Sequence, residues 1–395
     1  MITLESLGIL ESNPTPFYFY DTNLLDKTLA KVIESSRRYG YDVHYAIKAN
    51  ANRKILTRIA SYGLGADCVS GNEIELALKC GFKPEKIVFA GVGKTDSEIE
   101  FALDERIFCF HCESVQELEV INQLALRKSV VARVALRLNP DVKAGTHRHI
   151  TTGMIENKFG LSIEEVYEVK ELLSKLKNID LIGLHFHIGS QILDLEVFRT
   201  LSQKANQLKE ELFSNSRFSY INMGGGLGID YANPNNHPIP DFDGYFTAFY
   251  EHLNLEPNQK VHFELGRAIV AQCGSLITKV TFVKGPSSRK FAVVDAGMND
   301  LMRPALYDAS HSIINLSSKG SISTYDIVGP VCESADCFAK EIKLPKVERG
   351  DILAILSCGA YGEVMSSRYN MREIPYAVYS EDKLEPVYLS KELNT

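Results

Sequence analysis

Long apolar stretches are missing from this sequence. It contains no run of about 18 apolar residues, the length that a membrane-spanning helix needs. The N-terminal stretch MITLESLGILESNP also lacks the positive and then apolar regions of a secretory signal. Neither a solenoid period nor a low-complexity tract is visible. We therefore expect a globular, cytoplasmic protein.

An excess of positive charge is also lacking. The 43 Lys and Arg residues are outnumbered by 50 Asp and Glu residues, which gives a formal net charge of -7. This balance argues against a general affinity for nucleic acid or for an anionic membrane surface. Apolar residues make up 45% of the chain and charged residues 24%, as in ordinary globular proteins. We therefore expect neither a nucleic-acid partner nor a membrane partner.

Disulfide bonds are not expected, although the chain has 8 cysteines. Most of them lie in apolar, strand-like runs of a chain without an export signal, which favours reduced thiols. Cys109, His111 and Cys112 suggest a zinc site by their spacing. Alternation along a strand would place Cys109 and His111 on one face and Cys112 on the other. We interpret the three as packed strand residues and expect no metal.

Short β-branched and apolar runs recur at roughly even intervals, with amphipathic segments between them. This alternation predicts a parallel sheet, and eight units within about 225 residues fit a closed (β/α)8 TIM barrel better than an open sheet. Capping boxes are expected at Thr95/Glu98, Ser114/Glu117 and Ser162/Glu165. The predicted strands are 43–48, 65–69, 87–90, 107–111, 131–138, 181–187, 219–223 and 261–265. The predicted helices are 22–40, 52–62, 71–80, 95–105, 114–126, 162–176, 194–214 and 242–253.

The pattern divides the chain into three segments. Residues 1–24 contain a strand-like run, FYFYD, which we expect to pack with a C-terminal β domain. Residues 25–268 form the barrel. In residues 269–395 the helical period fades and short apolar runs alternate with Gly, Pro and Ser, which predicts a β-rich domain. The long polar loop 139–160 follows the fifth strand, where such loops often build active sites.

Unusual polar residues fall at the predicted C-terminal strand ends, where barrel enzymes carry out their chemistry. Lys48 closes the first strand, where desolvation would lower its pKa and free an amine suited to a Schiff base. The sequence YAIKAN alone is about equally consistent with a lysine at the strand end that extends into water and has no role in catalysis. After the seventh strand, Gly224, Gly225 and Gly226 offer backbone N–H groups that could surround a phosphate.

Glu264 ends an otherwise apolar eighth strand, where an unpaired carboxylate is costly. A protonated pyridine nitrogen would be a suitable partner, because a ring that keeps this proton is an effective electron sink. The alternative is an ion pair between Glu264 and Arg267 at the barrel rim. His187, which closes the sixth strand with His185, either stacks on a cofactor ring or is a hydrogen-bonded barrel histidine.

Seven motifs, in this order along the chain, resemble those of the diaminopimelate decarboxylases. This family lies in the alanine-racemase-like, fold-type III group of pyridoxal-phosphate enzymes, the Orn/Lys/Arg decarboxylase class-II family. The resemblance covers both predicted domains. The motifs are YAIKAN at 45–50, GLHFHIGSQ at 183–191, MGGGLG at 223–228, FELGR at 263–267, MRPALY at 302–307, CES at 332–334 and GAYGE at 359–363.

The resemblance implies decarboxylation of meso-2,6-diaminopimelate to L-lysine and CO2, the last step of bacterial lysine synthesis, with pyridoxal 5'-phosphate. Lys48 matches the lysine that forms the Schiff base, and His187 matches the histidine that stacks on the ring. The other implied cofactor contacts are Ser190, Gly224, Gly225, Gly226, Glu264, Gly266, Arg267 and Tyr361. The implied substrate contacts are Arg267, Arg303, Tyr307, Glu333 and Tyr361. Cys332 matches the proton donor, which with Glu333 enters the site from the partner subunit of a homodimer.

Other readings remain for these residues and for the activity. Taken alone, Cys332 could be a small buried thiol, and Arg303 and Glu333 a solvated pair. A related decarboxylase acting on ornithine, arginine or carboxynorspermidine, or a racemase, would share the barrel and Lys48. Glu264 disfavours the racemase, which has arginine there, and Arg303 with the CES motif disfavours the polyamine enzymes.

A non-catalytic pyridoxal-phosphate carrier built on the same barrel would lack a second domain. The predicted C-terminal domain therefore argues against this reading. Leu265 departs from the family, which usually has Pro at this position; Leu restores a backbone N–H but removes no reacting group.

Overall fold

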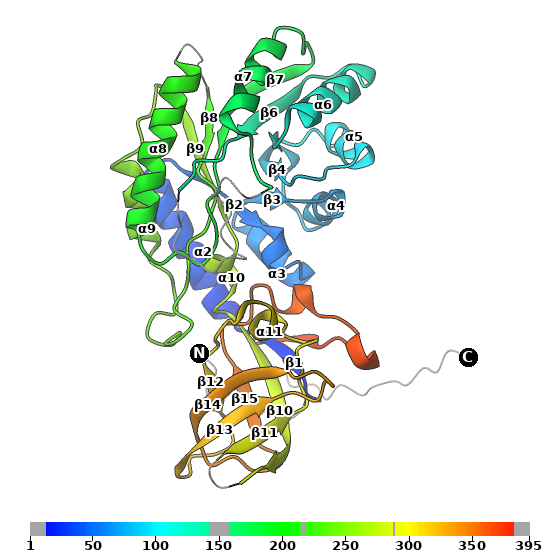
Figure 1. The fold of residues 1–395 in the computed structure, drawn as a ribbon, viewed down its shortest axis with the longest axis vertical. Coiled ribbons are helices and arrows are strands. Elements are labelled where there is room, and N and C mark those ends of the chain that lie inside the picture. The colour runs from blue at the N-terminus through cyan, green and yellow to red at the C-terminus, as the bar shows by residue number, and fades with distance from the viewer. Residues whose placement is uncertain (1–12, 143–157, 215–217, 287–288, 383–395) are drawn as a thin grey trace, which may run out of the picture. The chain divides into compact units, whose positions relative to one another are not determined.

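The structure is a computed structural model that describes residues 13–142, 158–214, 218–286 and 289–382 (Figure 1). Two compact units can be distinguished within it. Residues 27–229 and 239–269 form one unit. The described residues up to 26, residues 230–238 and those from 270 onward form the other. The short segment 230–238 thus belongs with the C-terminal residues, although it lies within the predicted barrel range 25–268.

The first unit contains the predicted closed barrel of parallel strands, with β9 pairing back to β2 (Figure 1). Its strands are β2 (Asp42–Ala46), β3 (Gly65–Cys68), β4 (Ile87–Phe89), β5 (Cys109–Cys112), β6 (Ala132–Arg137), β7 (Ile179–His185), β8 (Tyr220–Asn222) and β9 (Lys260–Leu265). Its helices are α3 (Arg53–Ser61), α4 (Gly71–Lys79), α5 (Asp96–Asp104), α6 (Val115–Arg127), α7 (Ile163–Leu172), α8 (Glu196–Phe213) and α9 (Phe242–Tyr250). Helix α2 (Thr22–Arg37) precedes the barrel strands, and α10 (Arg267–Val270) follows them. The TIM-barrel prediction is therefore confirmed.

Two of the three predicted capping boxes are formed, Thr95 with Glu98 and Ser162 with Glu165. The third prediction was half right. Ser114 accepts the N–H of Glu117, as an N-cap should. The Glu117 carboxylate, however, accepts from the N–H of Glu113 and from Nζ of Lys94. Burial of Lys94 explains the difference, because a buried ammonium needs a carboxylate partner.

Helix α9 fixes the outer face of β9 and thereby the strand that carries Glu264. Phe263 points outward against Tyr245, Phe246 and Phe249, with ring centroids 5.5, 5.0 and 4.9 Å away. Each of these fully buried aromatic side chains contributes roughly 1.5–3 kcal/mol through burial. Since neighbouring side chains alternate along a strand, Glu264 points into the barrel.

The second unit is a β-rich body. Its strands lie in the order β12-β15-β10-β11-β13-β14, and β1 pairs with β10 and β16. Their bounds are β1 (Phe17–Tyr20), β10 (Gly274–Lys284), β11 (Lys290–Val294), β12 (Ile313–Asn315), β13 (Ile322–Val328), β14 (Cys337–Pro345), β15 (Ile352–Ile355) and β16 (Tyr376–Tyr379). Helix α11 (Arg303–Tyr307) also belongs to this unit. The FYFY run is therefore a central strand, which explains why all four of its residues are buried.

Candidate active site

Lys48 lies in the short 3-10 turn Ile47–Ala49 directly after β2, which ends at Ala46, two residues before the predicted strand end at 48. Gly266 allows this turn to approach β9, because a Cβ there would lie 2.9 Å from Cβ of Ala49. Nζ of Lys48 donates to Oδ2 of Asp67 at 2.9 Å. The lysine side chain is 37% exposed, whereas Asp67 is fully buried at the end of β3. The amine is thus held by a carboxylate rather than only by solvent.

Two carboxyl groups near Lys48 ionise less readily than usual. Burial and the nearby Glu264 raise the pKa of Asp67, although Lys48 opposes the shift. Burial likewise raises the pKa of Glu73 to about 7, although the N–H of Val69 favours its carboxylate. The barrel mouth therefore holds an amine together with two carboxyl groups of raised pKa, of which Glu73 can take up a proton near neutral pH.

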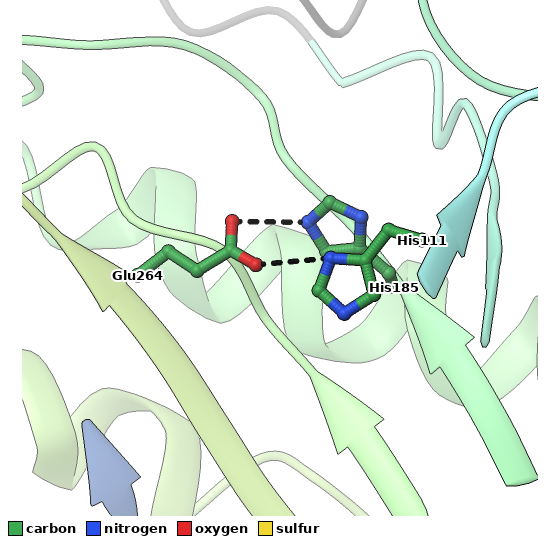
Figure 2. A group of neighbouring side chains, drawn as sticks. All are labelled: His111, His185 and Glu264. Carbon is green, nitrogen blue, oxygen red and sulfur yellow. Dashed lines mark hydrogen bonds and ion pairs between the residues drawn. The ribbon is translucent and has the colours of Figure 1, made fainter. Parts of the chain in front are cut away.

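Glu264 lies inside the barrel opposite two stacked histidines, His111 of β5 and His185 of β7, and each of its carboxylate oxygens faces one of them (Figure 2). Oε1 is 3.2 Å from Nδ1 of His111, and Oε2 is 3.2 Å from Nε2 of His185. The two imidazole rings stack with centroids 4.1 Å apart. Asn222 of β8 donates to Oε1 at 2.8 Å. The alternative of a Glu264–Arg267 ion pair is not found among the described residues, since this carboxylate faces the histidines and the amide.

The surroundings of Glu264 favour its carboxylate form. Burial opposes ionisation, but His185 and His111 outweigh it and hold the pKa of Glu264 well below its usual range. Burial also lowers the pKa of His185 to about 3, against the attraction of Glu264. A neutral His185 can donate from only one ring nitrogen, and Nε2 faces the carboxylate. The barrel interior thus presents a negative charge surrounded by neutral donors.

The glycine turn after β8 packs against the loop that follows β7. Gly224 and Gly226 have φ values of 68° and 103°, which L side chains rarely adopt. A Cβ at Gly226 would lie 2.8 Å from the carbonyl oxygen of Gly189. Next to Gly189, Ser190 accepts hydrogen bonds from Nη2 and Nε of Arg267 at 3.0 and 3.3 Å. A guanidinium and a hydroxyl therefore lie beside the turn.

His187 lies in the loop after β7, two residues beyond the strand end. Its Nδ1 accepts the N–H of Gly225 at 3.2 Å, which fixes the ring against the glycine turn. Burial, with Arg137 and Lys48 nearby, lowers the pKa of His187 well below its usual value. A neutral, oriented imidazole at this position suits stacking on a flat ring.

In the second unit, Arg303 begins α11 and is buried. Its Nη1 is 2.8 Å from Nε2 of His311, and its guanidinium lies 4.6 Å from the ring centroid of Tyr231. The residue is therefore not simply solvated, as one reading of the sequence allowed. Tyr307 ends the same helix and is half-buried. Tyr361 has a left-handed backbone with φ of 57°.

Cys332 lies in a loop of the second unit and is exposed, so the reading as a small buried thiol was wrong. Asp336 shapes this loop by accepting the N–H groups of Val331 and Met298, each at 2.7 Å. The exposed carboxylate of Glu333 accepts from the hydroxyl of Tyr369 at 2.5 Å. The loop thus presents a thiol and a carboxylate side by side at the surface.

Sequence reasoning missed Asp67, His111 and Asn222. Each is a polar residue at an inward-facing position of an otherwise apolar strand, and this was the available signal. His111 is more than the packing residue that the alternation suggested. Its partner Glu264 is more than 150 positions away in the chain, and only barrel closure brings the two together. Residues 143–157, which include His147, Arg148 and His149 of the predicted loop, lie outside the described residues.

One group among the described residues has the donor types of a metal centre: His111, His185 and Glu264, whose atoms lie within 4.8 Å of one another. Residues outside the group already contact it, because Asn222 donates to Oε1 of Glu264 and the hydroxyl of Tyr220 lies 2.8 Å from Nε2 of His111. We interpret the group as a hydrogen-bonded cluster.

A cavity of about 610 Å³ opens at the opposite, N-terminal end of the barrel. It is lined by the first residues of several strands, including His44, Tyr220 and His262. Barrel enzymes carry out their chemistry at the C-terminal strand ends, so we do not assign the active site to this cavity. Within the described part of the chain, none of the helices is long and apolar enough to cross a membrane.

A family model matches residues 25–271, and its description is "Pyridoxal-dependent decarboxylase, pyridoxal binding domain". This match and the barrel define the class as pyridoxal-dependent decarboxylases. A diaminopimelate decarboxylase of Bacteroides thetaiotaomicron is 54% identical over 94% of this chain and 96% of its own length. A second, from Aquifex aeolicus, is 43% identical over 91% of this chain and 84% of its own length. The chain belongs to the diaminopimelate decarboxylase family.

A solved structure supports the same assignment. The crystal structure of diaminopimelate decarboxylase from Helicobacter pylori complexed with L-lysine matches with a TM-score of 0.89. The two sequences are 40% identical, and the match covers 96% of this chain and 95% of the other.

The residues present fit pyridoxal phosphate by their chemistry. Lys48 supplies an amine for an aldehyde, and Ser190 with Arg267 supplies donors for a phosphate beside the glycine turn. Glu264 supplies a buried carboxylate for a ring nitrogen. A Cβ at any of the three turn glycines would lie closer than 3.0 Å to neighbouring backbone atoms, so only glycine allows the close approach of these segments.

Proposed function

We propose that the protein converts meso-2,6-diaminopimelate to L-lysine and CO2 with pyridoxal 5'-phosphate on Lys48. The observation that carries the proposal is the arrangement at the barrel mouth. Lys48 is paired with Asp67, and Arg267 is paired with Ser190 beside the glycine turn. Glu264 is buried inside the barrel. The names of the curated relatives and the lysine complex support the substrate.

The cofactor would be held mainly by residues of the barrel unit. Ser190, Arg267 and the turn would bind the phosphate, and His187 would lie against the ring. When bound, pyridoxal phosphate supplies a conjugated ring that accepts the electron pair left by the departing carboxylate. The proposed cofactor contacts are Lys48, His187, Ser190, Gly224, Gly225, Gly226, Glu264, Gly266, Arg267 and Tyr361.

Three side chains would manage protons during the reaction. Asp67 accepts a hydrogen bond from Nζ of Lys48 at 2.9 Å, and its raised pKa makes it a better proton acceptor than an ordinary aspartate for the proton that the amine must lose before attack. Glu264 holds a proton at the ring nitrogen, because its own pKa is lowered. The thiol of Cys332 gives a proton to the substrate Cα after CO2 has left. Its exposure allows access to a bound substrate.

The second unit would supply the substrate contacts and the dimer interface. Arg303 would bind the distal carboxylate and Glu333 the distal ammonium, which together distinguish diaminopimelate from ornithine. Arg267, Tyr307 and Tyr361 complete the proposed substrate contacts. We place the protein in the cytoplasm as a homodimer in which Cys332 and Glu333 enter the partner's site.

Exposed apolar side chains of the second unit support the dimer. Val364, Tyr369, Met371 and Ile374 follow one another within 11 residues of chain, and the side chain of Met371 is 93% exposed. Apolar groups concentrated in this way usually mark an interaction surface.

The test is to incubate the purified protein and cofactor separately with meso-diaminopimelate, ornithine, arginine and carboxynorspermidine, and to measure the CO2 released. We expect release from meso-diaminopimelate, with L-lysine in equal amount, and little from the other three. Faster release from ornithine, arginine or carboxynorspermidine would favour the alternative of a related decarboxylase.

A further inference from the structure

Asn222 uses every polar atom of its side chain at the end of β8, where it is fully buried. Its Oδ1 accepts the N–H of Gly224 at 2.7 Å. Its Nδ2 donates to Oε1 of Glu264 at 2.8 Å and to the hydroxyl of Tyr220 at 2.7 Å. One amide therefore joins the first residue of the glycine turn to the buried carboxylate.

The orientation of this amide follows from its partners. The backbone N–H of Gly224 can only donate, so the atom that faces it must be the amide oxygen. The amide nitrogen is then left to face Glu264, which as a carboxylate can only accept. A carboxyl group in place of the amide would have no donor for Glu264 unless it carried a proton.

Tyr220 and His111 close a ring of hydrogen-bonding groups with Asn222 and Glu264. The hydroxyl of Tyr220 is 2.8 Å from Nε2 of His111, whose Nδ1 is 3.2 Å from Glu264. A lone pair on Nδ1 would be repelled by the carboxylate, so we place a proton on Nδ1 of His111. Tyr220 then donates to Nε2, and Asn222 donates to Tyr220. Each polar atom of the Asn222 side chain thus has a partner when Glu264 is ionised.

We propose that Asn222 is a positioning residue that keeps Glu264 ionised and fixes it relative to the glycine turn. The inference rests on the proposed function, because it takes Glu264 to face the ring and the turn to face the phosphate of one cofactor. The backbones of the turn and of β9 are joined directly, because the N–H of Glu264 donates to the carbonyl oxygen of Gly224 at 2.8 Å. The amide of Asn222 adds the link from the turn to the side-chain carboxylate itself.

The test compares Asn222→Asp and Asn222→Ala with the wild-type chain by fluorescence titration with pyridoxal phosphate, from mildly acidic to alkaline pH. Asn222→Asp keeps the shape but sets two carboxyls at hydrogen-bond distance, where one must hold a proton. That proton replaces the amide donor at low pH and is lost as the pH rises. Other titratable or charged side chains also surround Glu264, so each variant is compared with wild type at the same pH. They are His44 of β2, Lys48 after β2, Asp67 of β3, His111 of β5, Arg137 of β6, His185 of β7 and His187 after β7.

We expect Asn222→Asp to bind the cofactor almost as well as the wild type at the acidic end and at least tenfold more weakly at the alkaline end, relative to wild type at the same pH. Asn222→Ala should bind roughly tenfold to a hundredfold more weakly, without the added pH dependence, because a hydrogen bond to a charged group is lost. If an alkaline sample of Asn222→Asp regains its affinity for the cofactor after it is acidified, the weaker binding at alkaline pH is not caused by unfolding.

Asn206→Asp is the matched control. Its amide also bridges two backbone groups, donating to the carbonyl of His252 and accepting from Asn254, but on α8 and away from Glu264. This variant should follow the wild-type pH profile. Equal binding by Asn222→Asp and wild type at every pH, or a loss that does not depend on pH, would overturn the inference. Failure of the wild type to bind the cofactor at all would instead overturn the proposed function.

Discussion

Buried histidines are the residues whose ionisation the fold restrains most clearly. Burial lowers the pKa of His44 to about 4, and the pKa of its neighbour His262 is also lowered. His44 Nδ1 lies 3.0 Å from the carbonyl oxygen of Lys86, so this nitrogen carries the proton. Nε2 of His44 then accepts from Nδ1 of His262 at 2.9 Å. This arrangement requires an unprotonated Nε2 on His44, so His44 must be neutral.

This pair predicts part of the acid sensitivity of the fold. His44 has a lower pKa in the folded chain than in the unfolded chain, so the unfolded state binds more protons below roughly pH 6.5. The stabilisation is therefore present at neutral pH and is lost as the pH falls from there toward about 4. His44→Asn should lower the free energy of unfolding at neutral pH. It should also reduce the acid dependence by up to about 1.4 kcal/mol per pH unit.

Urea unfolding at several pH values measures this effect, with the exposed His237→Asn as the control. The control should unfold with the wild-type pH dependence. If the free energy of unfolding of His44→Asn falls with acid as steeply as that of the wild type, His44 is not a source of the acid sensitivity.

The sequence could indicate which single residues matter at the barrel mouth, but not all of their partners. Lys48, His187 and Glu264 stood out because each is polar next to an apolar strand. The pairing of Lys48 with Asp67, and of Glu264 with His111, depends on the order in which the strands close the barrel. Alternation along a strand predicts the face on which a side chain lies and not its partner on another strand.

At the scale of elements, strands and helices could be predicted closely, whereas their connections could not. The predicted helix 22–40 ends at Arg37, and the predicted strand 181–187 ends at His185, which leaves His187 in a loop. Such end effects depend on hydrogen bonds to neighbouring elements, as with the N–H of Gly225 and His187. The assignment of residues 230–238 to the second unit depends on contacts such as Gln272 with His237, which no local pattern reveals.

The glycine turn yields a prediction at this scale. Gly226→Ala combines a φ of 103° with a Cβ that would lie 2.8 Å from the carbonyl oxygen of Gly189. We expect the loop that carries Ser190 to shift and the affinity for pyridoxal phosphate to fall at least about tenfold. Gly63→Ala is the matched control, because it has a φ of 83° but nothing within 4 Å of the added Cβ.

The control variant Gly63→Ala should lose roughly 1 kcal/mol of stability from backbone strain and keep the wild-type affinity for the cofactor. Fluorescence titration gives the affinity, and urea unfolding gives the stability. If Gly226→Ala binds the cofactor as tightly as Gly63→Ala does, the close contact between the turn and Gly189 does not affect cofactor affinity.

At the scale of the whole molecule, the proposed dimer makes each active site depend on two chains. Lys48 lies in the barrel unit of one chain, and Cys332 would come from the other. This arrangement predicts complementation between two inactive variants, Lys48→Ala and Cys332→Ala. Random exchange of subunits makes half of the dimers mixed, and each mixed dimer has one site with both residues intact.

The mixture should therefore recover about a quarter of the wild-type rate of CO2 release once the subunits have exchanged. Each variant incubated alone under the same conditions is the control and should stay inactive. Complete absence of recovery, with subunit exchange confirmed by native mass spectrometry, would place Lys48 and Cys332 of one active site in the same chain.

The most direct test of the account is to locate the cofactor on the chain. The purified protein, incubated with pyridoxal phosphate, is reduced with borohydride, digested and analysed by mass spectrometry. The account predicts one main phosphopyridoxyl group, attached to Nζ of Lys48, and its loss in Lys48→Ala. A main adduct on another lysine, or an unmodified Lys48 in protein that releases CO2 from meso-diaminopimelate, would contradict it.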